Sequence, residues 1–185
     1  DSGAFDFNSR TVFENLRTTY SLEAFSSAAA QGDGLANLLL GRAYKDGIGV
    51  DADPARGRAF YQEACDRGTV AGCLNFGTAL QRGIGGAQDL VQARTQFEFV
   101  CAAGDLRGCY NLGVLVRDAA AGQADYKEAV RLFRDTCDGG FAHGCNGLGA
   151  MYERGWGVNE SSADASSYYA LACDGGLRDA CSKVE

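Results

Sequence analysis

The sequence predicts an all-α fold, a solenoid of stacked helix-turn-helix repeats, on two observations. The first is a pair of cysteines eight positions apart that returns every 36 residues. The second is that glycines and aromatic residues recur in the same register. A fixed period of this size is typical of a repeat array. The cysteine pairs are Cys65 and Cys73, Cys101 and Cys109, Cys137 and Cys145, and Cys173 and Cys181. The aromatic positions are Phe25, Tyr61, Phe97, Phe133 and Tyr169.

The register divides the chain into two parts. Residues 20–185 follow the period of 36 and form an array of about four repeats plus a C-terminal half-repeat. Residues 1–19 precede it as an N-terminal segment. A short helix is expected over residues 9–18, because Val12, Phe13 and Leu16 fall on one helical face.

Each repeat is predicted to contain a leading and a trailing helix. In the first full copy the leading helix spans residues 71–82, where Leu74, Gly77 and Leu80 recur at helical spacing. A glycine inside a helix costs about 1 kcal/mol relative to alanine. We expect close approach of a neighbouring helix to compensate, because glycine has no Cβ.

The trailing helix has start and stop signals. Its predicted N-cap residues share one register position: Asp53, Asp89, Asp125 and Ser161. Its predicted C-terminal glycines are Gly32, Gly68, Gly104, Gly140 and Gly176. Glycine-rich loops join the two helices of a repeat, and the apolar residue between two glycines, such as Trp156, is expected to fold back as a plug.

Two regular disulfide schemes fit the repeat. The local scheme joins the two cysteines of each pair. The alternative joins Cys73 to Cys101 and so on along the chain, and leaves Cys65 and Cys181 without partners. The first unit has Ala29 and Asn37 at the two cysteine positions, so both members of a local pair are missing together, which favours the local scheme.

The cysteine usage indicates an oxidising compartment, either the periplasm or outside the cell. A zinc site is disfavoured, because the cysteine spacing is wrong for zinc and His143 is the only histidine. We therefore expect no metal and no cofactor.

The charge balance limits the partners. The net charge is −7, and the chain has 17 lysines and arginines against 24 acidic residues. Such a chain repels phosphate, which disfavours nucleic acid and anionic membrane surfaces. No apolar run approaches the ~20 residues that span a bilayer. A monomer is expected.

Two segments resemble Sel1-like repeats. They are Leu40-Gly-Arg-Ala-Tyr44 with Gly47-Ile-Gly-Val50, and Leu148-Gly-Ala-Met-Tyr152 with Gly155-Trp-Gly-Val158. Together with the cysteine pairs, they make residues 20–185 similar to the Helicobacter cysteine-rich protein family. The resemblance implies a right-handed α/α superhelix of Sel1/TPR-like repeats stapled by disulfides. It also implies either extracellular interactions or weak penicillin-binding or β-lactamase activity.

The residues of a hydrolase are missing from the sequence. No serine has a lysine three positions later, no Lys-Thr-Gly occurs, and one histidine is too few for a metal-dependent enzyme. A non-enzymatic scaffold that binds a protein or peptide is therefore favoured, with no catalytic residue assigned. A β-lactamase-like hydrolase of cell-wall-type ligands is the alternative, and a structural spacer is a third possibility.

Resemblance to tetratricopeptide arrays places a ligand-binding groove on one face of the leading helices. Amides there can pair with the backbone of an extended peptide, and arginines with its carboxylates. The alternative is a solvated helix face without a partner. The candidate groove residues are Asn75, Thr78, Arg82, Arg107, Tyr110, Asn111, His143, Asn146 and Arg154.

Overall fold

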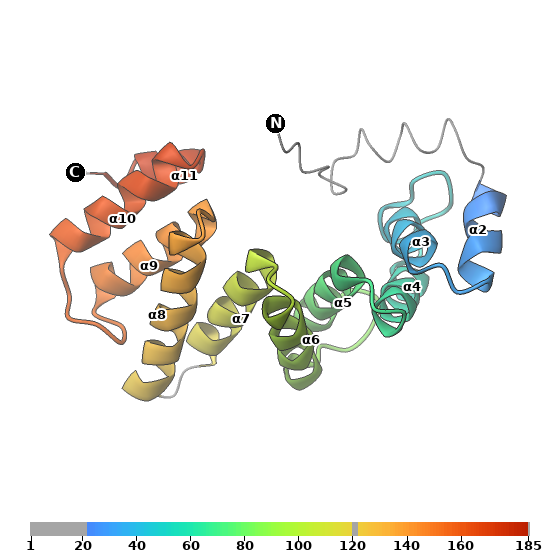
Figure 1. Ribbon diagram of the computed structural model, residues 1–185, viewed down its shortest axis with the longest axis horizontal. Helices are drawn as coiled ribbons and strands as arrows, with labels where there is room; N and C mark the ends of the chain where they lie inside the picture. The colour runs from blue at the N-terminus through green and yellow to red at the C-terminus, as the bar shows by residue number, and fades with distance from the viewer. Residues whose placement is uncertain (1–21, 120–121, 185) are drawn as a thin grey trace. The chain divides into compact units, whose positions relative to one another are not determined.

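The computed structural model describes residues 22–119 and 122–184. The chain divides into two compact units, Asp1–Asp89 and Leu90–Glu185. Within the described residues the regular elements are helices, and no strand occurs (Figure 1). The predicted all-α repeat fold is confirmed. The helix expected over residues 9–18 lies outside the described residues.

The helices alternate as the register predicts. In the first unit they are α2 (Leu22–Ala30), α3 (Gly34–Asp46), α4 (Pro54–Asp66) and α5 (Val70–Arg82). In the second unit they are α6 (Leu90–Ala102), α7 (Leu106–Asp118), α8 (Gln123–Asp138), α9 (Ala142–Arg154), α10 (Ser162–Asp174) and α11 (Arg178–Cys181). The leading helices are α3, α5, α7 and α9, and the trailing helices are α4, α6, α8 and α10.

Two trailing helices begin at the predicted N-caps. The Asp53 carboxylate accepts a hydrogen bond from the backbone N–H of Arg56 at 3.0 Å. The Ser161 hydroxyl accepts one from the N–H of Asp164 at 3.2 Å. Each bond satisfies a backbone donor that has no partner inside the helix.

The predicted N-cap at Asp125 is wrong. The N-cap of α8 is Gly122, and the helix begins at Gln123, which makes α8 16 residues long against 13 for α4, α6 and α10. The loop before α8 lacks the two spaced glycines of the other repeats, so no glycine turn fixes the start of the helix. Asp125 lies instead in the first turn of α8, where a carboxylate interacts favourably with the helix dipole.

The trailing helices end in a repeated backbone turn. After α4, the N–H of Gly68 donates to the carbonyl of Cys65 at 2.8 Å, and the N–H of Thr69 donates to the carbonyl of Ala64 at 2.9 Å. Gly68 has a φ of 80°. This is the Schellman arrangement, in which a left-handed residue terminates a helix. The same two bonds recur after α6, α8 and α10.

A disulfide lies at each of these joints. It links the last turn of a trailing helix to the first turn of the helix that follows, which is α5, α7, α9 or the short α11, with Cα–Cα distances between 4.4 and 4.8 Å. The bonds follow the local scheme. They join Cys65 to Cys73, Cys101 to Cys109, Cys137 to Cys145, and Cys173 to Cys181.

Glycines in the leading helices let an aromatic ring of the trailing helix come close. A Cβ on Gly41 would lie 2.5 Å from the Tyr61 ring, and a Cβ on Gly149 would lie 2.8 Å from the Tyr169 ring. Both tyrosines are buried, with 3% and 2% of their surface exposed. The expected compensation for these helical glycines, close packing of a neighbouring helix, is confirmed.

The loop after α9 folds back as predicted. Trp156 stacks on Tyr126 of α8, with ring centroids 5.2 Å apart and an interplanar angle of 6°. Gly157 has a φ of 72°, and a Cβ on it would lie 2.6 Å from the backbone of Tyr126. The loop therefore packs against the start of the preceding trailing helix, which requires glycine at this position.

The buried tyrosines Tyr61 and Tyr169 predict a loss of stability at alkaline pH. Burial raises the pKa of both phenols above the ordinary value of 10.0, and the hydrogen bond from Tyr169 to Glu153 adds to the effect. As pH rises past 10, the unfolded chain loses these protons first. The free energy of unfolding then falls, by at most ~1.4 kcal/mol per pH unit for each group.

Urea denaturation at pH values from about 8 to 11 measures this slope. We expect a shallower decline in Tyr61→Phe and in Tyr169→Phe, because each variant removes one titrating group. Slopes equal to that of the unmodified chain in both variants would contradict the explanation.

Candidate peptide-binding surface

The predicted groove residues lie on three leading helices. Asn75, Thr78 and Arg82 are on α5 in the first unit. The remaining six are in the second unit, where Arg107, Tyr110 and Asn111 are on α7, and His143, Asn146 and Arg154 are on α9. The two helices of the second unit bring several of these side chains together, and the candidate surface is built from them.

An aromatic cluster joins α7 to α9. The Tyr110 ring lies 5.6 Å from the Phe141 ring and 5.7 Å from the His143 ring, centroid to centroid. Phe141 and His143 are 5.3 Å apart. We call these three residues the aromatic patch. Distances in this range are typical of interacting aromatic pairs.

The patch rests on the core and reaches the surface. Tyr110 also packs against Phe133 of α8 at 5.8 Å, and Phe133 is fully buried. Tyr110 and Phe141 are half-buried, and His143 is exposed. Burial raises the pKa of Tyr110 above its ordinary value, and its phenolic hydroxyl can donate a hydrogen bond. The patch therefore offers apolar rings and a polar edge on a rigid base.

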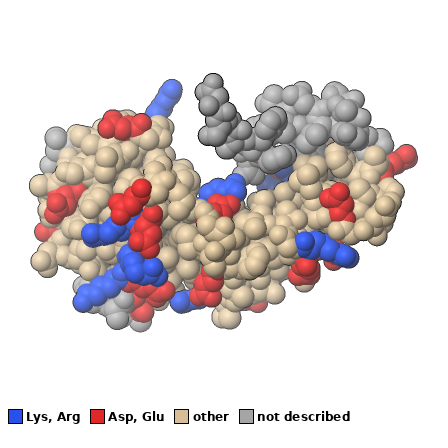
Figure 2. Space-filling view, in the orientation of Figure 1, with Lys and Arg blue, Asp and Glu red and all other residues tan. Residues whose placement is uncertain are grey.

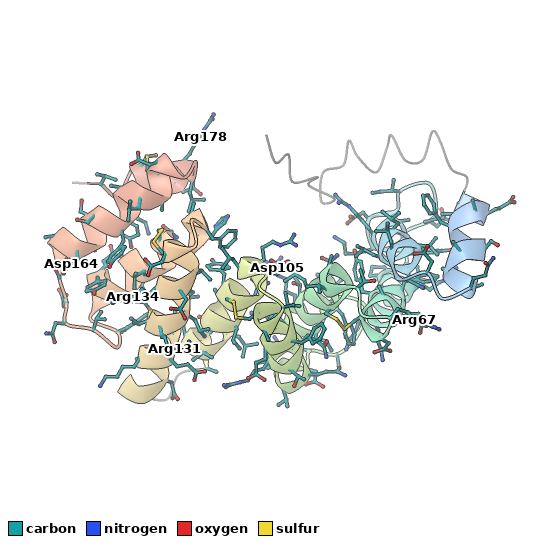
Figure 3. All side chains as sticks on the ribbon, viewed as in Figure 1. Arg67, Asp105, Arg131, Arg134, Asp164 and Arg178 are labelled. Carbon is teal, nitrogen blue, oxygen red and sulfur yellow. A yellow bond between two sulfur atoms is a disulfide. The ribbon has the colours of Figure 1, made fainter. Side chains whose placement is uncertain are left out.

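Arg107 is held by a carboxylate of its own chain. Its guanidinium donates two hydrogen bonds to Asp105, from Nε to Oδ1 at 2.9 Å and from Nη2 to Oδ2 at 2.6 Å. Asp105 is also the N-cap of α7 (Figure 3), and it accepts from the backbone N–H of Arg107. These contacts with Arg107 hold the pKa of Asp105 below its usual range. The expected contact between Arg107 and a ligand carboxylate would have to compete with Asp105.

The asparagine amides are better placed for a ligand. Asn111 and Asn146 are half-buried, and their side chains have no hydrogen-bond partner among the residues that the structure describes. An amide carries both a donor and an acceptor, as the backbone of an extended peptide requires. Asn75 on α5 has the same character in the first unit.

Other predicted residues are engaged within the chain or belong to the first unit. The Thr78 hydroxyl donates to the carbonyl of Leu74 in its own helix at 2.8 Å. The Arg154 guanidinium lies 4.6 Å from the centre of the Trp156 ring, so it belongs to the loop after α9. Arg82 is exposed at the C-terminal end of α5.

Phe141 was not among the predicted groove residues. It is the N-cap of α9 and makes no side-chain cap hydrogen bond. The same register position holds Asp33, Thr69 and Asp105 in the preceding repeats, and Leu177 in the C-terminal half-repeat. A phenylalanine where polar capping residues are expected was therefore a signal available in the sequence.

Charge does not single out one ligand class. On the face shown in Figure 2, acidic and basic side chains are intermixed. In the described ranges, no group of three or more His, Cys, Asp or Glu side chains could hold a metal ion. Over those same ranges, no helix combines the length and apolar character needed to cross a membrane.

The fold and the candidate surface define an α-solenoid protein built from helix pairs. One face of its leading helices carries the candidate surface. The Sel1 repeat matches residues 34–69, 106–141 and 142–177, which coincide with the helix pairs α3–α4, α7–α8 and α9–α10. The matched residues are more than half of the chain, and the chain belongs to the Sel1 repeat family. A search of the curated proteins gives no significant match.

Solved structures share the fold. The protective antigen c5321 of uropathogenic Escherichia coli, which displays an SLR fold, is 28% identical with a TM-score of 0.79 over 86% of this chain. A Sel1 repeat protein from Oxalobacter formigenes is 23% identical with a TM-score of 0.75, covering 92% of this chain and 69% of that one. This chain spans only 34% of the length of the antigen.

Helicobacter pylori cysteine rich protein B is a more distant match. It is 18% identical, with a TM-score of 0.37, over 94% of this chain and 97% of that one. A likeness at this level carries no argument about function.

Proposed function

We propose that the chain is an interaction scaffold of the periplasm or the extracellular space that binds an extended segment of a protein or peptide across α7 and α9. The Sel1 repeat fold and its four disulfides are consistent with a protein-interaction role in an oxidising compartment. The observation that carries the proposal is the combination of the aromatic patch with two half-buried amides on the same two helices, whose side chains have no hydrogen-bond partner among the described residues.

The chemistry of the surface matches an extended chain. Asn111 and Asn146 supply donors and acceptors for a peptide backbone, while Tyr110, Phe141 and His143 supply a platform for an apolar side chain. Because the patch is supported by the buried Phe133 ring, little conformational entropy is lost on binding.

Selection of displayed peptides on the oxidised chain, followed by fluorescence anisotropy, tests the proposal. We expect the affinity for a selected peptide to fall at least about tenfold in His143→Ala and in the double variant Asn111→Ala, Asn146→Ala, since each tenfold corresponds to ~1.4 kcal/mol. Asn159→Ala is the matched control, because Asn159 is an exposed amide on the loop after α9. Undiminished binding in both groove variants would rule out this surface.

The β-lactam alternative rests on family resemblance, and no geometry in the described residues favours it. Turnover of a chromogenic β-lactam above that of reduced, unfolded protein would support the β-lactam alternative.

A further inference from the structure

The outer face of α6 differs from those of the other trailing helices. One stripe of its exposed face holds Val91, Thr95, Phe99 and Ala102, none of which is charged, and the exposed Glu98 lies beside this stripe. The same positions are Ala55, Ala59, Glu63 and Asp66 on α4, Lys127, Arg131, Asp135 and Asp138 on α8, and Ala163, Ser167, Leu171 and Asp174 on α10. Each of those three helices carries at least one acidic residue in its last turn, and α6 carries an alanine there.

Large apolar side chains on this face are open to solvent. Val91 is 81% exposed and Phe99 is 48% exposed. The opposite face of α6 is buried and carries Ala93, Phe97 and Val100. A helix that is apolar on both faces is normally covered on both. Exposed apolar groups gathered on one helix indicate a contact surface.

An ion pair borders the same face. Arg94 Nε lies 2.8 Å from Glu98 Oε1, and Arg94 Nη2 lies 3.4 Å from Glu128 of α8. Residues 94 and 98 are one turn apart, so they form one edge of the apolar stripe. The α6 residues of this edge, Arg94 and Glu98, carry one charge of each sign, and this pair is complementary to itself when reversed.

We propose that α6 forms a two-fold symmetric contact with α6 of a second copy of this chain, with the helices antiparallel and centred on Thr95. In that arrangement Val91 of each copy faces Phe99 of the other copy. With a rise of 1.5 Å per residue, Arg94 lies about 3 Å along the axis from Glu98 of the other copy. A two-fold interface must be self-complementary in this way.

The contact is small. Stable interfaces bury roughly 800 Å² on each partner, and one face of a 13-residue helix offers less. The dimer is therefore weak and depends on concentration, with a dissociation constant in the micromolar range. This proposal departs from the monomer expected from the sequence pattern.

Sedimentation velocity on the oxidised full chain tests the interface. Over a concentration series from about 1 to 500 μM, which spans the weak range expected for a small contact, the weight-average mass should rise above the 19.5 kDa of one chain. Phe99→Glu should weaken dimerisation at least tenfold. The matched control is Leu171→Glu, at the same register position on α10 with 53% exposure, and it should leave dimerisation unchanged.

Mixing two charged variants tests the symmetry of the contact. The variant Val91→Lys, Phe99→Lys and the variant Val91→Glu, Phe99→Glu should each be monomeric alone and should associate when mixed. Circular dichroism checks that both remain helical. The proposal is overturned if the unmodified chain stays monomeric throughout, if Leu171→Glu weakens the dimer as much as Phe99→Glu, or if the folded, mixed variants do not associate.

Discussion

We expect Phe133→Ala to lower the free energy of unfolding by about 3–5 kcal/mol, the usual cost of removing a buried aromatic ring from a core. Phe133 has no exposed surface. A Cβ on either Gly113 or Gly147 would lie 2.9 Å from its ring, so the ring fills the space between the leading helices α7 and α9. The Tyr110 ring, 5.8 Å away, would lose its support as well.

Urea denaturation of the oxidised protein measures the loss at Phe133. Phe133→Leu keeps most of the volume and should cost less than about 1.5 kcal/mol. Phe99→Ala provides a comparison with a half-exposed phenylalanine, which should change stability by roughly 0.5 kcal/mol or less at protein concentrations where the chain is monomeric. A loss at Phe133→Ala no greater than at Phe99→Ala would show that the ring does not support the second unit.

We expect removal of the disulfide between Cys137 and Cys145 to cause the second large loss of stability. Replacing both residues with alanine should destabilise the fold by about 2.6 kcal/mol, the chain-entropy value for a closed loop of nine residues. Both side chains are buried, and alanine leaves no unpaired thiol. A shift of the urea midpoint to lower concentration would report this loss, with a slope equal to or steeper than that of the unmodified chain because the unfolded state is less constrained.

Thiol titration under denaturing conditions separates the two pairing schemes in the same experiment. With the local bonds, both the unmodified chain and the double variant have no free thiol. With the alternative bonds, the unmodified chain exposes Cys65 and Cys181, and the double variant adds Cys109 and Cys173. Detection of any free thiol in the fully oxidised protein would therefore count against the local pairs.

The sequence predicted helix ends well where the signal is local. The leading helix expected over residues 71–82 is observed as Val70–Arg82. Asp53 and Ser161 cap their helices, because a cap depends only on a side chain and the next few backbone N–H groups. The prediction failed at Asp125, since the register was extended through a loop that lacks the glycines of the other copies.

The candidate site was predicted less completely, because it depends on contacts between repeats. The period indicates that α7 and α9 are neighbours, but it does not specify the distance or angle between them. The grouping of Tyr110 with Phe141 and His143 depends on that angle. Whether Arg107 can contact a ligand depends on its two hydrogen bonds to Asp105. Those bonds are visible in the structure but not in the sequence.

The position of the disulfides also determines what a protease can achieve. Each bond spans the joint between two repeats, so a cut inside that joint, for example after Arg67 or Arg107, leaves the two fragments covalently linked. A cut in the loop within a repeat, for example after Arg82 or Arg154, crosses no bridged segment and separates the chain once it unfolds. A cut between two repeats therefore does not release a fragment. The resistance of the chain to digestion depends instead on the glycine loops within the repeats.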